Sequence, residues 1–549
     1  MFHVEHYLKI KKMKIKGNIV DIENRRIYKG TVIVENNIIK DIIEEDNNNN
    51  EYILPGLINS HVHIESSMVT PLEFSKEAIK HGTVAVVTDP HEIANVLGVN
   101  GINFMLENSK LSPLKFYFGV PSCVPATGFE TSGAIIDSKI TDKLLKNDEF
   151  KFLSEMMNFP GVIFNDDEVH NKLKSALKYN KRIDGHAPGL KGKDLEKYIN
   201  SGISTDHECT TYHEAEEKIK LGMKVQIREG SAAKDFENLY QLIDNETNNT
   251  MICTDDTHPD DLVKGHINVI IKQALDKELD IFNILQTVCI NPVKHYDLEV
   301  GLLHKGDFAD FIVIDNFENF NIIKTIINGK IQFENKEIKF NNTSFNEINN
   351  FSAKPITTND ILIKSTLDKK FDVINCFDGD LFTKRSLETI KTQDNTFLSD
   401  TDKDILKIVV YNRYKDSKPI VGFIKGFGLK KGAIAQSIAH DSHNIIAVGT
   451  NDNDIVKAIN KIVENKGGIS LIDGSNIFDI KLEIAGLMTN KPVKEIAEKY
   501  EFITKKTIEL GSKLKSPFMT LSFMALLVIP EIKIGDKGIF DGEKFEFID

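Results

Sequence analysis

Short apolar runs alternate with amphipathic helical patterns through the middle of the chain. The predicted strands are the run that contains His61, then 83–88, 115–120, 162–164, 182–184, 203–206, 224–227 and 251–254. Eight parallel strands with helices between them are what a (β/α)8 TIM-like barrel requires. We therefore predict an α/β barrel domain over 56–299. An open doubly wound sheet is the alternative, although no Gly-x-Gly-x-x-Gly motif opens a helix in this region.

One barrel helix has both a start signal and a stop signal. The stretch 70–73, Thr-Pro-Leu-Glu, has the pattern of a capping box with proline at the first helical position. Gly82 follows where such a helix would stop, because glycine readily adopts the left-handed backbone conformation common after helix ends. The sequence predicts a helix between these two points.

The regions on either side of the barrel have a different pattern. Short β-branched runs separated by turns extend from 15 to 41, and a similar pattern returns from 305 to 327. We predict that 1–55 and 300–345 pair into one small β-domain. Residues 346–365 are rich in Asn, Thr and Lys and are predicted to form a linker.

The remaining segment, 366–549, is predicted to be an α+β domain. Apolar runs at 405–411 and 420–424 indicate strands. A helix predicted over 454–465 has one apolar face, formed by Ile455, Ile459, Ile462 and Val463.

Composition narrows the functional classes. The chain has 549 residues, of which 41% are hydrophobic and 27% charged, as is typical of a soluble globular protein. Its formal net charge of -13 argues against an extended nucleic-acid surface.

The five cysteines form no Cys-x-x-Cys pair and suit the reducing cytoplasm, where we expect the protein to act. The most apolar late stretch, 518–529, is too short to span a membrane. We therefore expect a small-molecule partner, and neither nucleic acid nor membrane.

Candidate chemistry begins at His61-Val62-His63. Successive side chains of a strand point to opposite faces, so the two histidines project together while Val62 packs on the other side. Two imidazoles at this spacing can hold one metal ion. A pair of core histidines is the alternative interpretation, because a His-x-His motif alone is short.

Polar side chains also follow the later predicted strands. They are Asp89 with His91 and Glu92, then Glu155, His186, His207 and Asp255. The carboxyl ends of barrel strands meet at one rim, so we expect these side chains to lie together. Neutral imidazoles and carboxylates are suitable ligands for divalent zinc, manganese or iron, and a carboxylate can bridge two ions. Two ions favour hydrolysis over redox or phosphoryl transfer. Asp256 is the alternative ligand to Asp255, because predicted strand ends shift by a few residues.

Four longer motifs carry a family resemblance. They are Asp-Pro-His-Glu-Ile-Ala-Asn-Val at 89–96, Ser-Glu-Met-Met-Asn at 154–158, Gln-Ile-Arg-Glu-Gly-Ser-Ala at 226–232 and Thr-Asp-Asp-Thr-His-Pro at 254–259. With the histidine series they resemble the adenine deaminases of the amidohydrolase superfamily. The resemblance covers nearly the whole chain, including 440–444 in the last domain. It implies hydrolysis of adenine to hypoxanthine and ammonia in purine salvage, with manganese or iron.

The resemblance also implies roles for individual residues. His61 and His63 would bind the more buried ion and His186 and His207 the other. Glu155 would bridge the two, in the place where many superfamily members have a carboxylated lysine. Asp255 would be a ligand and would exchange protons with the attacking hydroxide.

The chemistry of deamination requires further groups. Ring protonation and the departure of ammonia need an acid/base at the metal edge, and Glu155, Glu92 or His91 are candidates to pass on the proton taken by Asp255. Recognition of the purine edges is predicted for Arg228, Glu229 and Ser231, with a loop salt bridge as the alternative.

Several questions stay open at the level of sequence. His440 and His443 either reach the site or cap a turn. A different binuclear amidohydrolase, acting on a cyclic amide or an N-acyl group, and a catalytically silent scaffold are the competing functions. We also expect a homodimer or a larger homo-oligomer.

Overall fold

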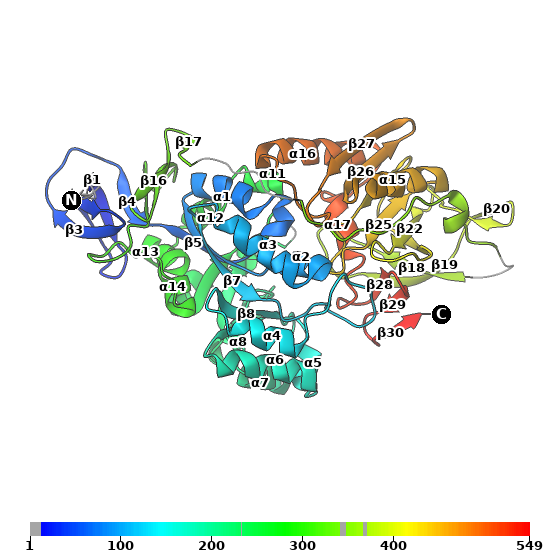
Figure 1. Cartoon of the computed structure of the whole chain (residues 1–549), viewed down its shortest axis with the longest axis horizontal. Coiled ribbons are helices and arrows are strands. Elements are labelled where there is room, and N and C mark those ends of the chain that lie inside the picture. Colours follow the sequence, from blue (N-terminus) through cyan, green and yellow to red (C-terminus); the bar gives the residue numbers. More distant parts are fainter. Residues whose placement is uncertain (1–11, 232, 341–346, 366–369, 549) are drawn as a thin grey trace, which may run out of the picture.

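The computed structural model describes residues 12–231, 233–340, 347–365 and 370–548. Three parts follow one another along the long axis of the molecule: a β-domain, a barrel and an α+β domain (Figure 1). Residues 1–11 of the predicted β-domain, and 341–346 at its border with the predicted linker, lie outside the described residues. No helix within the described ranges is long and apolar enough to cross a membrane.

The β-domain is one sheet built from both sides of the barrel. Its strand order is β17-β16-β15-β14-β4-β1-β2-β3. Ile53 of β4 pairs with Ile19 of β1 on one side and with Val313 of β14 on the other, so β4 joins the two chain segments. The bounds are β1 Lys12–Asp21, β2 Arg26–Glu35, β3 Ile38–Glu44, β4 Tyr52–Pro55, β14 Phe311–Ile314, β15 Ile322–Ile327, β16 Lys330–Glu334 and β17 Glu337–Ile338.

The middle of the chain forms the predicted barrel. One parallel sheet has the order β13-β5-β6-β7-β8-β9 and a second has β10-β11-β12. A parallel bridge between Ile183 and Ile203 joins β9 to the second sheet, and β12 continues into β13, where Asp255 pairs with Val62 of β5. The bounds are β5 Leu57–His63, β6 Thr83–Thr88, β7 Lys115–Val120, β8 Phe150–Met156, β9 Arg182–Gly185, β10 Thr205–Asp206, β11 Lys224–Arg228, β12 Thr250–Cys253 and β13 Asp255–Asp256.

The fourth barrel strand corrects the prediction. It is β8, whereas Val162 lies in the short helix α5, Phe159–Ile163. The Asn158 side chain caps this helix by accepting a hydrogen bond from the Gly161 N–H, and Pro160 lies in its first turn. The apolar residues after this proline therefore form a helical turn. As a result, Glu155 lies inside a buried strand, one residue before its end.

Helices cover the outside of the barrel. α1, Pro71–Lys80, begins at the predicted proline, and Gly82 follows it with a φ of +83°. The predicted capping box does not form, because Glu73 pairs with Lys76 and the Thr70 side chain makes no capping hydrogen bond. The other main helices are α2 His91–Leu97, α3 Val99–Ser109, α4 Ser138–Leu145, α6 Asp167–Lys178, α7 Gly192–Asn200, α8 Tyr212–Lys220 and α12 Ile267–Asp276.

The C-terminal domain has a mixed sheet covered by helices. Its strand order is β19-β18-β23-β22-β25-β24-β26-β27. The predicted helix is α15, Asp452–Asn465, and its predicted apolar face is buried against this sheet. The bounds are β18 Lys370–Asn375, β19 Lys384–Thr389, β22 Ile405–Tyr411, β23 Ile420–Lys425, β24 Ala433–Gln436, β25 Ile445–Gly449, β26 Gly468–Asp473, β27 Asn476–Lys481, α16 Val493–Glu509 and α17 Pro517–Phe523. A small sheet follows, formed by β28 Ile532–Gly535, β29 Gly538–Asp541 and β30 Glu546–Ile548.

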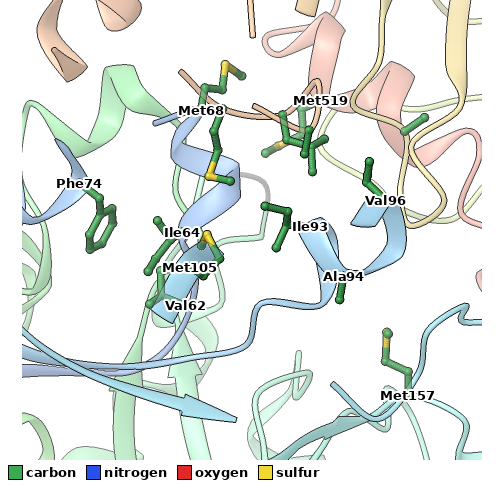
Figure 2. Packing of buried hydrophobic residues seen from close by; sticks show 14 of the residues in the cluster. Val62, Ile64, Met68, Phe74, Ile93, Ala94, Val96, Met105, Met157 and Met519 are labelled. Atoms are coloured by element: carbon green, nitrogen blue, oxygen red, sulfur yellow. The ribbon is translucent and has the colours of Figure 1, made fainter. Parts of the chain in front are cut away.

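The barrel and the C-terminal domain share one hydrophobic core. Met519 of α17 belongs to the same buried cluster as Ile93 and Val96 of α2 and Met68. Figure 2 shows this packing, with Met519 over the helix that follows β6. Because apolar surface from both parts is buried in this contact, each part stabilises the other.

We predict that Met519→Ala lowers the thermal midpoint of the barrel and the C-terminal domain together. Met519 is 6% exposed, and truncating a buried methionine costs about 2–5 kcal/mol. Differential scanning calorimetry would measure the shift. Ile477→Ala is the matched control, because Ile477 is 49% exposed and its truncation should have little effect. Two separate transitions, with only one of them shifted, would contradict a shared core.

Candidate metal centre and active site

Six potential ligands meet at the carboxyl ends of the barrel strands. His61 and His63 lie at the end of β5, His186 and His207 directly follow β9 and β10, and Asp255 begins β13. Glu155 reaches the same rim from β8. The parallel arrangement of the strands therefore brings together residues that are far apart in sequence.

The distances between the first group of ligand atoms fit one ion. The Nε2 atoms of His61 and His63 are 3.2 Å apart, and they lie 3.5 and 3.1 Å from Oδ1 of Asp255. Atoms that bind one divalent ion at about 2.1 Å lie about 3.0–3.4 Å from one another. The spacing of these three side chains is therefore compatible with one shared ion.

Glu155 lies between the two pairs of histidines. Its Oε2 is 2.9 Å from Nδ1 of His186 and 3.1 Å from Nε2 of His207. Its Oε1 is 3.4 Å from Nε2 of His63. One oxygen thus faces His186 and His207 and the other faces His63, so the carboxylate lies between the two pairs, where it could bridge two ions.

The buried carboxylates of this cluster need nearby positive charge, which a metal ion can supply. Burial raises the pKa of the Glu155 carboxyl, but His186 and His207 hold it well below its usual range. Burial lowers the pKa of His207, but hydrogen bonding to Glu155 and the nearby carboxylates raise it to about 9. Burial and the neighbouring His207 lower the pKa of His61 to about 4. Divalent ions would balance the carboxylates without protonating the imidazoles, so the donor set fits metal ions.

The structure distinguishes between the two consecutive aspartates. Asp255 has a φ of 53°, a left-handed conformation that interrupts the strand between β12 and β13. Its Oδ1 faces the histidines, and its Oδ2 accepts a hydrogen bond from Arg228. Asp256 instead accepts a hydrogen bond from the Ser66 hydroxyl. The carboxylate next to the histidines is therefore that of Asp255.

His91 and Glu92 begin α2 beside this cluster. Nδ1 of His91 lies 3.0 Å from Asp89 and 3.4 Å from Glu155. Glu92 contacts two histidines of the C-terminal domain: its Oε1 is 2.6 Å from Nδ1 of His440, and its Oε2 is hydrogen-bonded to Nε2 of His443. The C-terminal domain therefore reaches the rim of the barrel.

Comparisons with known proteins agree with this architecture. Residues 52–332 match the Amidohydrolase family, and residues 380–546 match the Adenine deaminase C-terminal domain. The chain is 53% identical over 548 residues to the adenine deaminase of Methanosarcina mazei, covering 98% of this chain and 99% of that protein. The adenine deaminases of Sulfurovum sp. and Borreliella burgdorferi are 48% and 46% identical, with 98% of this chain and 99% of each protein covered. This chain belongs to the adenine deaminase family.

Membership of a metal-dependent family accounts for the presence of a cluster of ligand-type side chains. The Amidohydrolase family is metal-dependent, and the described residues of this member include several overlapping groups of ligand-type side chains. One group is Glu155 with His186 and His207, and another is His61 with His207 and Asp255. The atoms in each group lie within 4.8 Å of one another.

A cavity opens beside the cluster, and several of the candidate ligands line it. Its barrel side is polar and consists of His63, His91, Glu92, Glu155, His186, His207, Glu208, Arg228, Asp255 and Asp256, with Met157. Its other side is mostly apolar and comes from the C-terminal domain, through Leu381, His440, Asp441, Phe523, Leu526, Val528 and Ile529. This member of the family therefore builds its cavity from two domains.

Arg228 lines the cavity but is held by carboxylates. Its NH1 lies 3.2 Å from Oδ2 of Asp255 and also contacts Glu208, and its Nε lies 3.0 Å from Asp235. The three acidic partners raise its pKa although burial lowers it. The salt bridge that was the alternative for this loop is present, and it fixes the oxygen of Asp255 that faces away from the histidines.

Glu229 and Ser231 are not among the described residues that line the cavity. Glu229 accepts a hydrogen bond from the backbone N–H of Phe236, and the Ser231 hydroxyl donates to Asp261. Side chains alternate along an extended segment, so an inward Arg228 turns Glu229 outward. In this structure both side chains make hydrogen bonds within the loop, and their part in recognising the purine edges stays a prediction.

Sequence reasoning overlooked several lining residues. Glu208 directly follows His207, and Asp441 lies between His440 and Ser442, so both belonged to motifs already considered. The apolar wall comes from the segment that contains Phe523 and Leu526, the most apolar stretch late in the chain. Its composition indicated burial, but only the folded structure reveals what it is buried against.

We predict that Glu155→Gln lowers the number of bound metal ions while the protein stays folded. An amide keeps an oxygen in place but removes the negative charge between the two histidine pairs. Elemental analysis and circular dichroism would measure metal content and folding. The matched control is Glu65→Gln, because burial raises the pKa of Glu65 to about 7 and an uncharged side chain should be tolerated there. Full metal content in Glu155→Gln would contradict the bridging position.

Proposed function

We propose that this chain hydrolyses adenine to hypoxanthine and ammonia, using two divalent metal ions. The observation that carries the proposal is the convergence of six ligand-type side chains at one barrel rim, five of which line the cavity, in a chain about 50% identical over its length to adenine deaminases. Purine salvage is the corresponding cellular role.

The proposed ligand assignment follows the distances. His61 and His63 hold the deeper ion, since His61 is fully buried, and His186 and His207 hold the other. Glu155 would bridge the two ions, and Asp255 would complete the deeper site. Manganese or iron suits this set of imidazoles and carboxylates. When bound, the ions lower the pKa of water and stabilise negative charge that develops during its attack.

The proton route uses residues that already face the cavity. Water adds to the ring carbon that bears the amino group, a ring nitrogen gains a proton, and the amino group leaves as neutral ammonia. Asp255 accepts the proton of the attacking water, because its Oδ1 faces the ligand cluster while Arg228 holds its Oδ2. His91, Glu92 and Glu155 line the same cavity and are the proposed groups for the transfers that follow.

The charge of the cavity favours an uncharged substrate. Its lining includes the carboxylates of Glu92, Glu155, Glu208, Asp255, Asp256 and Asp441. The only arginine among the described lining residues, Arg228, is already paired with acidic side chains. A phosphate group would find no free arginine among the described lining residues. A free purine base is the ligand that fits.

We also propose that the protein acts in the cytoplasm as a homo-oligomer. All five cysteines are buried and none forms a disulfide, which suits a reducing compartment. Exposed apolar side chains such as Phe382, Leu387 and Phe502 offer surface for self-association. Light scattering during size-exclusion chromatography would measure the oligomeric state.

We predict that the manganese-loaded protein releases ammonia from adenine, and that adenosine and AMP are poor substrates. Coupled ammonia detection, with cytosine and dihydroorotate as further substrates, would measure the preference. Treatment with a chelator should abolish turnover, and manganese should restore it. Turnover of dihydroorotate in place of adenine would favour another amidohydrolase activity. No turnover of any substrate by fully metal-loaded protein would favour a silent scaffold.

We predict that Asp255→Asn lowers kcat for adenine about 10²- to 10⁴-fold, the usual contribution of a general acid/base. The amide retains an oxygen that can face the histidines but cannot accept the proton. Steady-state kinetics and elemental analysis of the same preparation would separate the two effects. Asp256→Asn is the matched control, because its carboxylate pairs with Ser66 and should affect kcat less. Wild-type kcat in metal-loaded Asp255→Asn would refute the assignment.

A further inference from the structure

The wall of the cavity opposite the ligand cluster contains one polar ring. His440 lines the cavity, and its imidazole stacks on the ring of Phe523, with centroids 4.9 Å apart and an interplanar angle of 15°. The neighbouring wall residues Leu526, Val528 and Ile529 are apolar. His440 is therefore the histidine that the C-terminal domain presents to a ligand.

Glu92 fixes the orientation of this ring. Its carboxylate lies 2.6 Å from Nδ1 of His440 and can only accept hydrogen bonds, so Nδ1 is the donor. Nε2 of His440 makes no hydrogen bond to any residue that the structure describes, and the ring is among those that border the cavity. One ring nitrogen is thus used for positioning and the other is available to a ligand.

The backbone around His440 is held from both domains. The Ser442 carbonyl accepts a hydrogen bond of 2.5 Å from the Tyr414 hydroxyl, and the His443 N–H donates to the Ala439 carbonyl over 2.7 Å. The Asn444 side chain donates to the carbonyl of Thr131 in the barrel over 2.9 Å. A side chain on so well anchored a segment is pre-organised for binding.

The chemistry of the available nitrogen matches a purine edge. Burial lowers the pKa of His440, but the charge of Glu92 and the hydrogen bond to it raise the pKa to about 9, so Nε2 carries a hydrogen at neutral pH. Adenine offers ring nitrogens as acceptors at its edges. The nitrogen next to the reacting carbon belongs with the groups that move protons on the barrel side. The acceptors that remain for the opposite wall are N3 and N7.

We propose that His440 is a specificity-determining residue that donates a hydrogen bond from Nε2 to N3 or N7 of the purine. This inference rests on the proposed function, because it requires adenine in the cavity. It gives the C-terminal domain a direct part in recognising the substrate. Glu92 acts through His440 as a positioning residue, in addition to its place beside the ligand cluster.

Two substitutions separate recognition from domain contact. His440→Asn places an amide near the position of Nδ1, which keeps the contact with Glu92 and removes the nitrogen that faces the cavity. His440→Gln places its amide near the position of Nε2 and keeps a donor there. Lys537→Ala is the matched control, because it removes hydrogen bonds to the barrel carbonyls of Gly128 and Glu130 without changing a lining residue.

The decisive experiment combines these variants with 3-deazaadenine and 7-deazaadenine, in which a carbon replaces one acceptor. We expect His440→Asn to raise KM for adenine and the inhibition constant of hypoxanthine about 10- to 100-fold, as for a hydrogen bond to a charged group. Metal content should not change. His440→Gln should bind adenine more tightly than His440→Asn, and Lys537→Ala should bind it like the wild type.

Wild-type protein should bind one of the two deaza compounds more weakly than adenine by a similar factor. His440→Asn should lose no further affinity for that compound, because the same hydrogen bond is already absent. Additive losses for both compounds, unchanged KM in His440→Asn, or tighter binding by His440→Asn than by His440→Gln would overturn the inference. Absence of adenine turnover in metal-loaded wild type would instead refute the proposed function, and this inference with it.

Discussion

The site depends on keeping buried carboxylates charged. Glu155 and Asp255 are less than 10% exposed, and an isolated carboxylate would not remain ionised at such depth. Each is surrounded by groups that favour its charged form: imidazoles around Glu155, and imidazoles with Arg228 around Asp255. The same arrangement supplies the lone pairs that a metal ion needs. Ligand geometry and charge compensation are therefore one constraint, which the barrel meets by bringing several strand ends to one rim.

This constraint extends beyond the ligands. Arg228 pairs with Asp255, Glu208 and Asp235, so the cation that holds the proton acceptor in place is not available for a substrate anion. Glu92 meets the same requirement through His440 and His443 of the other domain. Charge compensation thus links α2 and the end of β11 to the cluster, and it links the C-terminal domain to the barrel.

Much of this arrangement could be predicted from local pattern. Strand alternation and the polar residues after each strand indicated the barrel and its rim, because both depend on short-range periodicity and a fixed topology. The prediction was wrong where a local signal had a competitor: Pro160 lies in the first turn of a helix that includes Val162 and Ile163, and Glu73 pairs with Lys76 instead of capping its helix. The directions of Glu229 and Ser231 depend on the conformation of their loop, which local pattern does not give. The partners of the 518–529 segment are distant in sequence, so no local pattern identifies them.

The C-terminal domain covers the rim of the barrel with apolar surface, which the rim itself does not provide. A rim of carboxylates and imidazoles open to water would interact weakly with a small flat base, since water screens charges and competes for each hydrogen bond. The segment that includes Phe523 and Leu526 supplies apolar surface over the rim, and its burial lowers the local dielectric. Because Glu92 joins the two domains at the edge of the cavity, the contact that docks the C-terminal domain also orients His440. Docking, exclusion of water and recognition of the substrate then depend on the same few side chains.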